Sequence, residues 1–273
     1  MSRFLRHLAS LTFAAVIALG AAGVGVPSAA AADLSIGEAE MEMVRLLNRE
    51  RAKLGLLPVR VDSRLMAIAR ERSTDMATKH YFSHTQPDGR NVFDLVIAAN
   101  IKWYGLAEII AANNASTLAD SAAVARNGWM LSPGHRSVVV SNSYNYVGVG
   151  LAIDTVKNRK IWTAVFMKGP DRTGGWLKFN PLPAFSIASS ERYRTVKVSW
   201  AGGDVQLVVL TSGFRHYQIQ VRTNGGAWSW WSYGTTATER SIRVWRGYNY
   251  DLRVRACDKA GNCGAWQVQH LKG

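Results

Sequence analysis

The hydrophobic pattern of this 273-residue chain changes its period once, and that change limits the folds open to it. Up to about residue 131 apolar residues recur at steps of three and four, as on one face of a helix. From residue 196 onward they alternate with polar residues, as in half-buried strands. The segment 169–193 lies between these two parts and is interrupted by glycine and proline, which indicates a linker. The chain therefore predicts two folded parts of different class.

The first part, residues 33–168, is expected to be α+β, with helices placed around a small sheet. Helical periodicity and capping residues predict four helices, a first over 36–54, a second beginning after Asp62, a third over 92–100 and a fourth over 117–131. Two apolar runs joined by a polar turn predict strands over 146–153 and 160–167.

The second part, residues 194–273, is expected to be an all-β sandwich of antiparallel strands. Its alternating apolar residues fall in four groups: Val196, Val198 and Trp200; Tyr217, Ile219 and Val221; Ile242 and Val244; and Leu252, Val254 and Ala256. Turn-forming residues follow the second group at 224–226 and the fourth group at 260–262.

Residues 1–32 have the features of a signal peptide. Arg3 and Arg6 precede an apolar run over 8–26, and small residues at 29–32 suit a cleavage site. A retained membrane anchor is the alternative, which the scarcity of large side chains disfavours. No other stretch approaches the roughly 20 apolar residues that span a membrane. We therefore expect an extracellular protein, secreted by its signal peptide.

The chain carries a net charge of +14, and its last third is the most basic. Residues 179–273 hold 12 basic and 5 acidic side chains, a net charge of +7. Such a field favours anionic partners, and secretion argues against nucleic acid among them. An acidic lipid or a cell-wall glycan at the envelope surface is the expected partner. The alternative explanation of the positive charge is that it only keeps the protein soluble.

The two cysteines, Cys257 and Cys263, are too few for a disulfide scaffold or a four-cysteine zinc site. Five residues separate them, a length typical of a hairpin loop, so in a secreted protein we expect them to form a disulfide.

Six of the ten tryptophans lie in residues 194–273, and three of them are close neighbours: Trp228, Trp230 and Trp231. Adjacent strand residues face opposite ways, so these three cannot all be core. Exposed indoles often mark a glycan-binding site, while packing in the core or between domains is the competing interpretation.

Four motifs follow one another within residues 38–168. They are Tyr-Phe-Ser-His-Thr at 81–85, Gly-Leu-Ala-Glu at 105–108, Trp-Met-Leu-Ser-Pro-Gly-His-Arg at 129–136, and Val-Gly-Val-Gly at 147–150 with Ile-Trp-Thr-Ala-Val-Phe at 161–166. Together they resemble the signatures of the CAP superfamily, the sperm-coating-protein-like relatives of cysteine-rich secretory and plant pathogenesis-related proteins. The resemblance implies an α-β-α sandwich with an open cleft. The C-terminal part resembles a fibronectin type III or immunoglobulin-like domain.

Carried over by motif, the resemblance places His84, Glu108 and His135 in the cleft. It implies a ligand-binding site for a lipid or a cell-wall component. His84 and His135 could also hold a divalent metal such as Zn²⁺, which would allow a metal-assisted hydrolase. A third possibility is a hydrogen-bond network that only stabilises the fold, in a protein that is purely adhesive. No nucleophile is evident and no catalytic residue is assigned, so binding is favoured over catalysis.

The chain departs from the family pattern at three positions. Ala107 and Ile109 flank the glutamate where Gly and Asn are usual, and Ala164 replaces a Gln in the last motif. Alanine and isoleucine side chains offer no hydrogen bonds, so we expect a thinner polar network around the cleft.

Gly148 and Gly150 lack the third glycine of a dinucleotide-binding fingerprint and lie in an expected strand. They predict close backbone packing instead.

Overall fold

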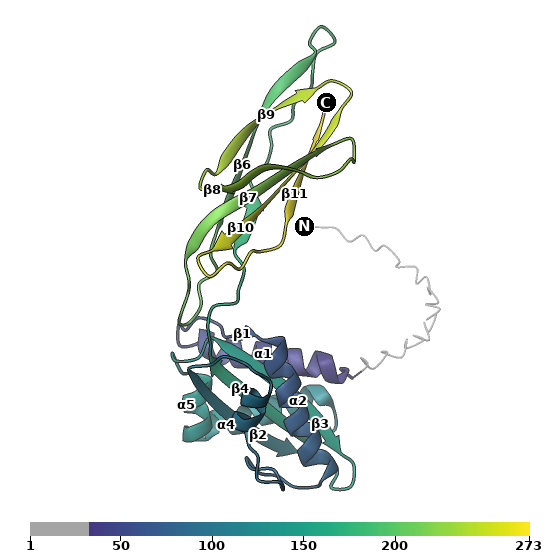
Figure 1. The fold of residues 1–273 in the computed structure, drawn as a ribbon. Coiled ribbons are helices and arrows are strands. Elements are labelled where there is room, and N and C mark those ends of the chain that lie inside the picture. Colours follow the sequence, from purple (N-terminus) through teal and green to yellow (C-terminus); the bar gives the residue numbers. More distant parts are fainter. Residues whose placement is uncertain (1–32) are drawn as a thin grey trace, which may run out of the picture. The chain divides into compact units, whose positions relative to one another are not determined.

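The computed structural model describes residues 33–273 (Figure 1). The signal peptide expected over 1–32 lies outside the described residues. Within 33–273, no helix has both the length and the apolar character needed to cross a bilayer.

The described chain begins with the helices and the sheet of the first part. The helices are α1 (Ile36–Ala52), α2 (Ser63–Thr78), α3 (Val92–Ala98), α4 (Leu118–Leu131) and α5 (Pro133–Val139). The strands are β1 (Arg60–Val61), β2 (Gly105–Asn113), β3 (Tyr146–Asp154) and β4 (Arg159–Lys168). The four expected helices and both expected strands are present, whereas β1, β2 and α5 were not anticipated.

Local side chains set the helix starts. Ser35 and Glu38 form a reciprocal capping box at α1, and the Asp62 carboxylate accepts a hydrogen bond from the backbone N–H of Arg64 at α2. Pro133, which was expected only to end α4, also begins α5, because proline suits the first helical position.

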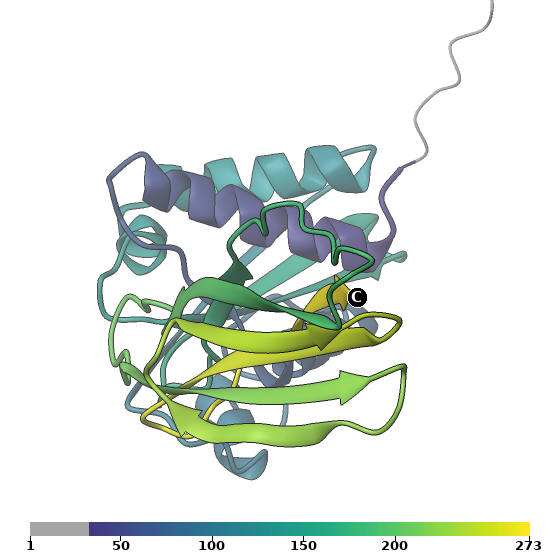
Figure 2. The ribbon, with the colours of Figure 1, turned by 90° about the horizontal axis from the view of Figure 1, so that it is seen from above.

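The first part is an α-β-α sandwich, as expected. Its sheet has the order β1-β3-β4-β2, with β1 parallel to β3 and the other pairs antiparallel. Along β4, Trp162, Ala164 and Phe166 enter the core beneath α1 and α4, while Val165 and Met167 enter the core beneath α2 and α3. Helices α1 and α4 lie side by side in purple and teal (Figure 2).

The prediction of close backbone packing at Gly148 and Gly150 is confirmed. A Cβ added at Gly148 would lie 2.1 Å from the carbonyl carbon of Leu65, and one at Gly150 would lie 2.2 Å from that of Ala69. Both contacts are with the backbone of α2, so the helix rests directly on β3.

The C-terminal part is all-β. Its strands are β5 (Trp176–Phe179), β6 (Tyr193–Gly203), β7 (Phe214–Thr223), β8 (Ser229–Thr235), β9 (Glu239–Trp245), β10 (Asn249–Asp258) and β11 (Gln267–Lys272). They form a four-stranded sheet, β11-β10-β7-β8, and a three-stranded sheet, β5-β6-β9. Trp200, Val198 and Val254 are among the buried residues of its core. The fibronectin type III likeness and the boundaries 33–168, 169–193 and 194–273 stay predictions.

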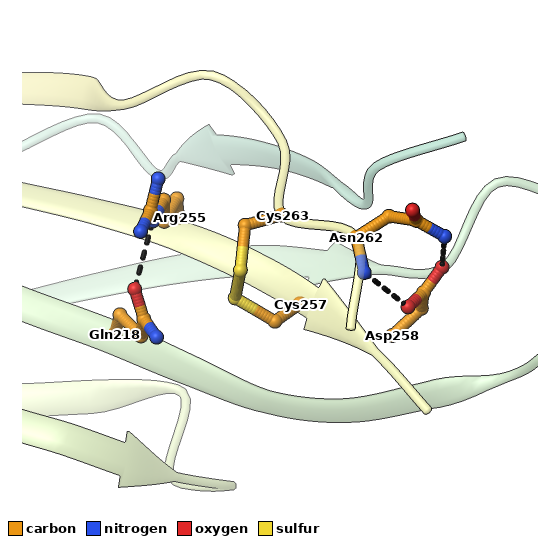
Figure 3. Close-up of a disulfide and its surroundings, with 6 residues drawn as sticks. All are labelled: Gln218, Arg255, Cys257, Asp258, Asn262 and Cys263. Atoms are coloured by element: carbon orange, nitrogen blue, oxygen red, sulfur yellow. Dashed lines mark hydrogen bonds between the residues drawn. A yellow bond between two sulfur atoms is a disulfide. The ribbon is translucent and has the colours of Figure 1, made fainter. Parts of the chain in front are cut away.

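The expected disulfide between Cys257 and Cys263 is present, with the two Cα atoms 4.1 Å apart. It links the end of β10 to the chain beyond the turn (Figure 3). In the same turn, Asp258 accepts hydrogen bonds from the backbone and the side-chain amide of Asn262. The disulfide therefore closes a short loop that is already hydrogen-bonded.

We expect the double substitution Cys257→Ala/Cys263→Ala to lower the free energy of unfolding by about 2 kcal/mol, because so short a loop restricts the unfolded chain only moderately. Urea denaturation measures this loss, and the reduced wild-type protein should show a similar one. A variant as stable as the oxidised protein would contradict the prediction.

Candidate functional site

The predicted site residues come from separate elements. His84 lies in the loop after α2, Glu108 in β2 and His135 in α5. The structure adds Arg72 of α2, which sequence reasoning missed. These four residues are called the His/Glu site below.

A buried ion pair forms the base of the His/Glu site. Arg72 is 0% exposed and its Nε donates to Glu108 Oε1 at 2.8 Å, while the Glu108 side chain is only 3% exposed. The other Glu108 oxygen, Oε2, lies 2.7 Å from Nδ1 of His84. A carboxylate paired with arginine only accepts hydrogen bonds, so Nδ1 of His84 carries the proton and Nε2 stays free for a ligand.

Arg72 is held by two further bonds. Its Nη1 donates to the hydroxyl of Tyr81 at 3.0 Å and its Nη2 to the carbonyl oxygen of Ser83 at 2.7 Å. Burial lowers the pKa of Arg72, but the hydrogen bond to Glu108 and the negative charge of that residue have the larger combined effect. The pKa of Arg72 is therefore raised. Burial, together with a hydrogen bond to Asp75, raises the pKa of Tyr81 to about 12. The loop that carries His84 is thus tied to α2.

His84 itself is open to solvent, with 55% of its side chain exposed. His135 is half-buried, and within residues 33–273 its ring makes no hydrogen bond to a protein group. Burial, and then the charge of His84, lower the pKa of His135, so the two rings are within electrostatic reach. The structure therefore joins His84 directly to Glu108, while His135 makes no hydrogen bond with either of them in the described part of the chain.

A zinc site that took Glu108 as its third ligand would compete with the hydrogen bonds of that carboxylate. Both oxygens of Glu108 are engaged, by Arg72 and by His84. In the described part of the chain, one group of three potential ligand side chains has its ligand atoms within 4.8 Å of one another: Asp171, Asp204 and Asp258. The His/Glu site is not such a group.

The departures from the family pattern have a structural counterpart. Ile109 of β2 pairs with Ala164 of β4, and both are buried in the core beneath α1 and α4. Apolar packing thus occupies the positions where the family usually has amides. Polar contacts to Glu108 come instead from Arg72 and His84.

We expect the His135 ring to titrate below 6.5, and its pKa to rise toward that value in His84→Asn, which removes the neighbouring charge. Because the unfolded chain binds the proton more readily, the contribution of His135 lowers the free energy of unfolding as the pH falls through 6.5. Histidine Cε1 NMR signals measure both midpoints. An unchanged His135 midpoint in the variant would contradict the closeness of the rings.

A second candidate surface lies on the sheet of β7 and β10. Arg253 lies over the ring of Trp228 at 4.2 Å and over that of Trp266 at 4.6 Å. The guanidinium of Arg222 also lies over the ring of Trp228, and that of Arg255 lies over the ring of Trp266, each 4.5 Å from the ring centre. These five residues are called the Trp–Arg face below.

Glutamines orient the arginines of the Trp–Arg face. Gln218 accepts a hydrogen bond from Arg255 at 2.8 Å (Figure 3), and Gln220 accepts one from Arg253 at 2.7 Å. Arg222 is paired with Asp251. Next to the face, Trp230 packs near Trp266 and is 50% exposed. The expectation that the neighbouring tryptophans cannot all be core is thereby confirmed.

Comparison with known proteins matches residues 44–166 to the family model described as the Cysteine-rich secretory protein family, CAP. YkwD, an uncharacterized protein of Bacillus subtilis (strain 168), is 32% identical over 133 residues, which are 49% of this chain and 48% of that protein. YlbC, an uncharacterized membrane protein of the same strain, is 30% identical over 129 residues, which are 47% of this chain and 34% of that protein. The chain thus spans about half or less of the length of these relatives.

Among solved structures, an extracellular protein containing an SCP domain from Bacillus anthracis str. Ames is 26% identical, with a TM-score of 0.42. The match covers 48% of this chain and 41% of that one.

Proposed function

We propose that this protein, whose residues 44–166 match the CAP family model, is an extracellular binding protein whose His/Glu site holds an envelope lipid. The observation that carries the proposal is the half-exposed His84 fixed on a buried Arg72–Glu108 pair. A ring held in one orientation, with a free Nε2, is preorganised to recognise the polar head of a ligand.

Two exposed apolar side chains that are neighbours of the site histidines in the sequence are our reason for proposing a lipid instead of a sugar. Leu131, four residues before His135, is 85% exposed, and Phe82, two residues before His84, is exposed as well. Exposed large apolar residues often mark surfaces that bind other molecules. The engagement of both Glu108 oxygens favours binding over proton transfer by that carboxylate.

Decanoate, kept below its micelle-forming concentration, is a suitable probe for isothermal titration. We expect saturable binding that is weakened about tenfold or more in His84→Ala, the loss of a charge-assisted hydrogen bond. His270→Ala, in β11 of the C-terminal part, is the matched control and should bind as the wild type does. Equal binding by wild type and His84→Ala would overturn the proposal. If the protein does not bind decanoate but sediments with peptidoglycan, and His84→Ala abolishes that sedimentation, the ligand of the site is a wall component and not a lipid.

For the C-terminal part we propose attachment to the envelope surface through the Trp–Arg face. Its support is the alternation of three arginines with two indoles, beside the exposed Trp230, in a segment with a net charge of +7. Indoles stack on sugar rings, and guanidinium groups pair with the acidic groups of a cell-wall glycan.

Co-sedimentation with purified cell-wall material tests the attachment. We expect Trp266→Ala to reduce the bound fraction, and Tyr248→Ala, which removes an exposed aromatic ring (48%) outside the face, to leave it unchanged. Binding should also weaken as salt rises, because the guanidinium contribution is screened. Equal binding by both variants would overturn the attachment role.

A further inference from the structure

A polar cavity that shares no residue with the His/Glu site lies where β1 meets α2. It has a volume of about 410 Å³, and arginines and hydroxyl groups dominate its lining. The residues that matter for its chemistry are Arg60, Ser63, Arg64, Tyr146, Arg172 and Thr173. They come from three segments that are distant in the sequence.

Strand pairing and the hydroxyl of Tyr146 hold the three segments together. Parallel pairing of β1 with β3 sets Arg60 beside Tyr146. The Tyr146 hydroxyl accepts a hydrogen bond from the backbone N–H of Arg172 at 2.8 Å and lies 3.2 Å from the hydroxyl of Thr173. The positions of Arg60 and Arg172 along the cavity wall are therefore fixed by the fold.

The charges of this cavity are not balanced. Arg64 is neutralised by the buried Asp62, with contacts of 3.0 Å from Nε and 2.5 Å from Nη2. Within residues 33–273, no carboxylate forms an ion pair with Arg60 or Arg172. Three arginines against one aspartate leave the lining with a charge of +2.

A ligand that matches this lining is small, anionic and rich in oxygen atoms. Guanidinium groups bind phosphate oxygens through paired hydrogen bonds, and the hydroxyls of Ser63 and Thr173 can donate further ones. The N-terminus of α2, a helix of 16 residues, begins at the same wall and adds a favourable dipole. We propose that this cavity binds a phosphate group, presented as a phosphate ester, between Arg60 and Arg172.

Inorganic phosphate is the probe for the first test, titrated into the full chain at constant ionic strength with chloride as the competing anion. We expect saturable binding that is weakened about tenfold or more in Arg60→Gln/Arg172→Gln. The control, Arg45→Gln/Arg49→Gln, removes the same charge from the exposed side of α1 and should bind as the wild type does. All four arginines are exposed, so both variants should fold, which their thermal unfolding checks.

Two further probes identify the source of the phosphate group. Glycerol 3-phosphate represents a soluble or polymer-borne ester, and phosphatidylglycerol vesicles represent a lipid headgroup. A loss of binding confined to Arg60→Gln/Arg172→Gln with either probe supports the proposal and names the source. Equal losses in both arginine variants, or no phosphate binding in excess of chloride, would overturn it. His84→Ala should leave phosphate binding unchanged, which separates this cavity from the His/Glu site.

Discussion

Gly148→Ala and Gly150→Ala are each expected to lower the free energy of unfolding by about 3 kcal/mol or more. The added methyl group would lie 2.1 Å from a backbone atom of Leu65 in the first case and 2.2 Å from one of Ala69 in the second. Neither contact can be relieved by rotating a side chain, so α2 has to move off β3. Thermal and urea unfolding measure the loss.

Gly128→Ala is the matched control for these two substitutions. Gly128 lies inside α4, and a Cβ there would meet nothing within 4 Å. Alanine in a helix interior is more favourable than glycine, so this variant should be more stable by about 0.5–1 kcal/mol. If Gly148→Ala were as stable as Gly128→Ala, the direct packing of α2 on β3 would be wrong.

Arg72→Met is expected to lower the free energy of unfolding by about 3–5 kcal/mol. The substitution leaves the carboxylate of Glu108, whose side chain is 3% exposed, buried without its arginine partner. It also removes the hydrogen bonds to Tyr81 and Ser83 that tie down the loop of His84. Ligand binding at the His/Glu site should weaken along with the stability.

The double variant Arg72→Met/Glu108→Met separates the ion pair from the rest of the packing. With no buried charge left unpaired, it should recover part of the stability that Arg72→Met loses. Arg45→Met is the control, because its exposed pairing with Glu42 contributes less than about 1 kcal/mol. A loss in Arg72→Met no larger than that in Arg45→Met would show that the buried pair does not hold the site.

Much of the first part could be predicted because its signals are local. The capping residue Asp62 and the helical spacing of Leu65, Ile68 and Met76 indicate α2 without reference to any other element. The same spacing indicates that Arg72 is buried, because it lies four residues after Ile68 and four before Met76 on the buried face of the helix. A charged residue on an apolar helix face requires a partner of opposite charge. Glu108, in an otherwise apolar segment, could therefore have been proposed from the sequence as the partner of Arg72.

The unanticipated elements depend on tertiary contacts. Strand β2 has no two-residue alternation and holds three alanines, which are uncommon in strands, and it is stabilised by its pairing with β4 along its whole length. Strand β1 has two residues and exists only through its pairing with β3. In the second part, alternation identified strands such as β10, but the stacking of Arg253 between Trp228 and Trp266 depends on which strands are neighbours.

The most direct test of the central claim is to follow the Cε1 signals of the five histidines in residues 33–273 by NMR during a decanoate titration. If His84 and His135 belong to one ligand site, their signals should shift together with a single saturating dependence on concentration. The signals of His216 and His270, in the C-terminal part, should stay in place. Shifts of His84 without His135, or of His270 alone, would contradict a shared site.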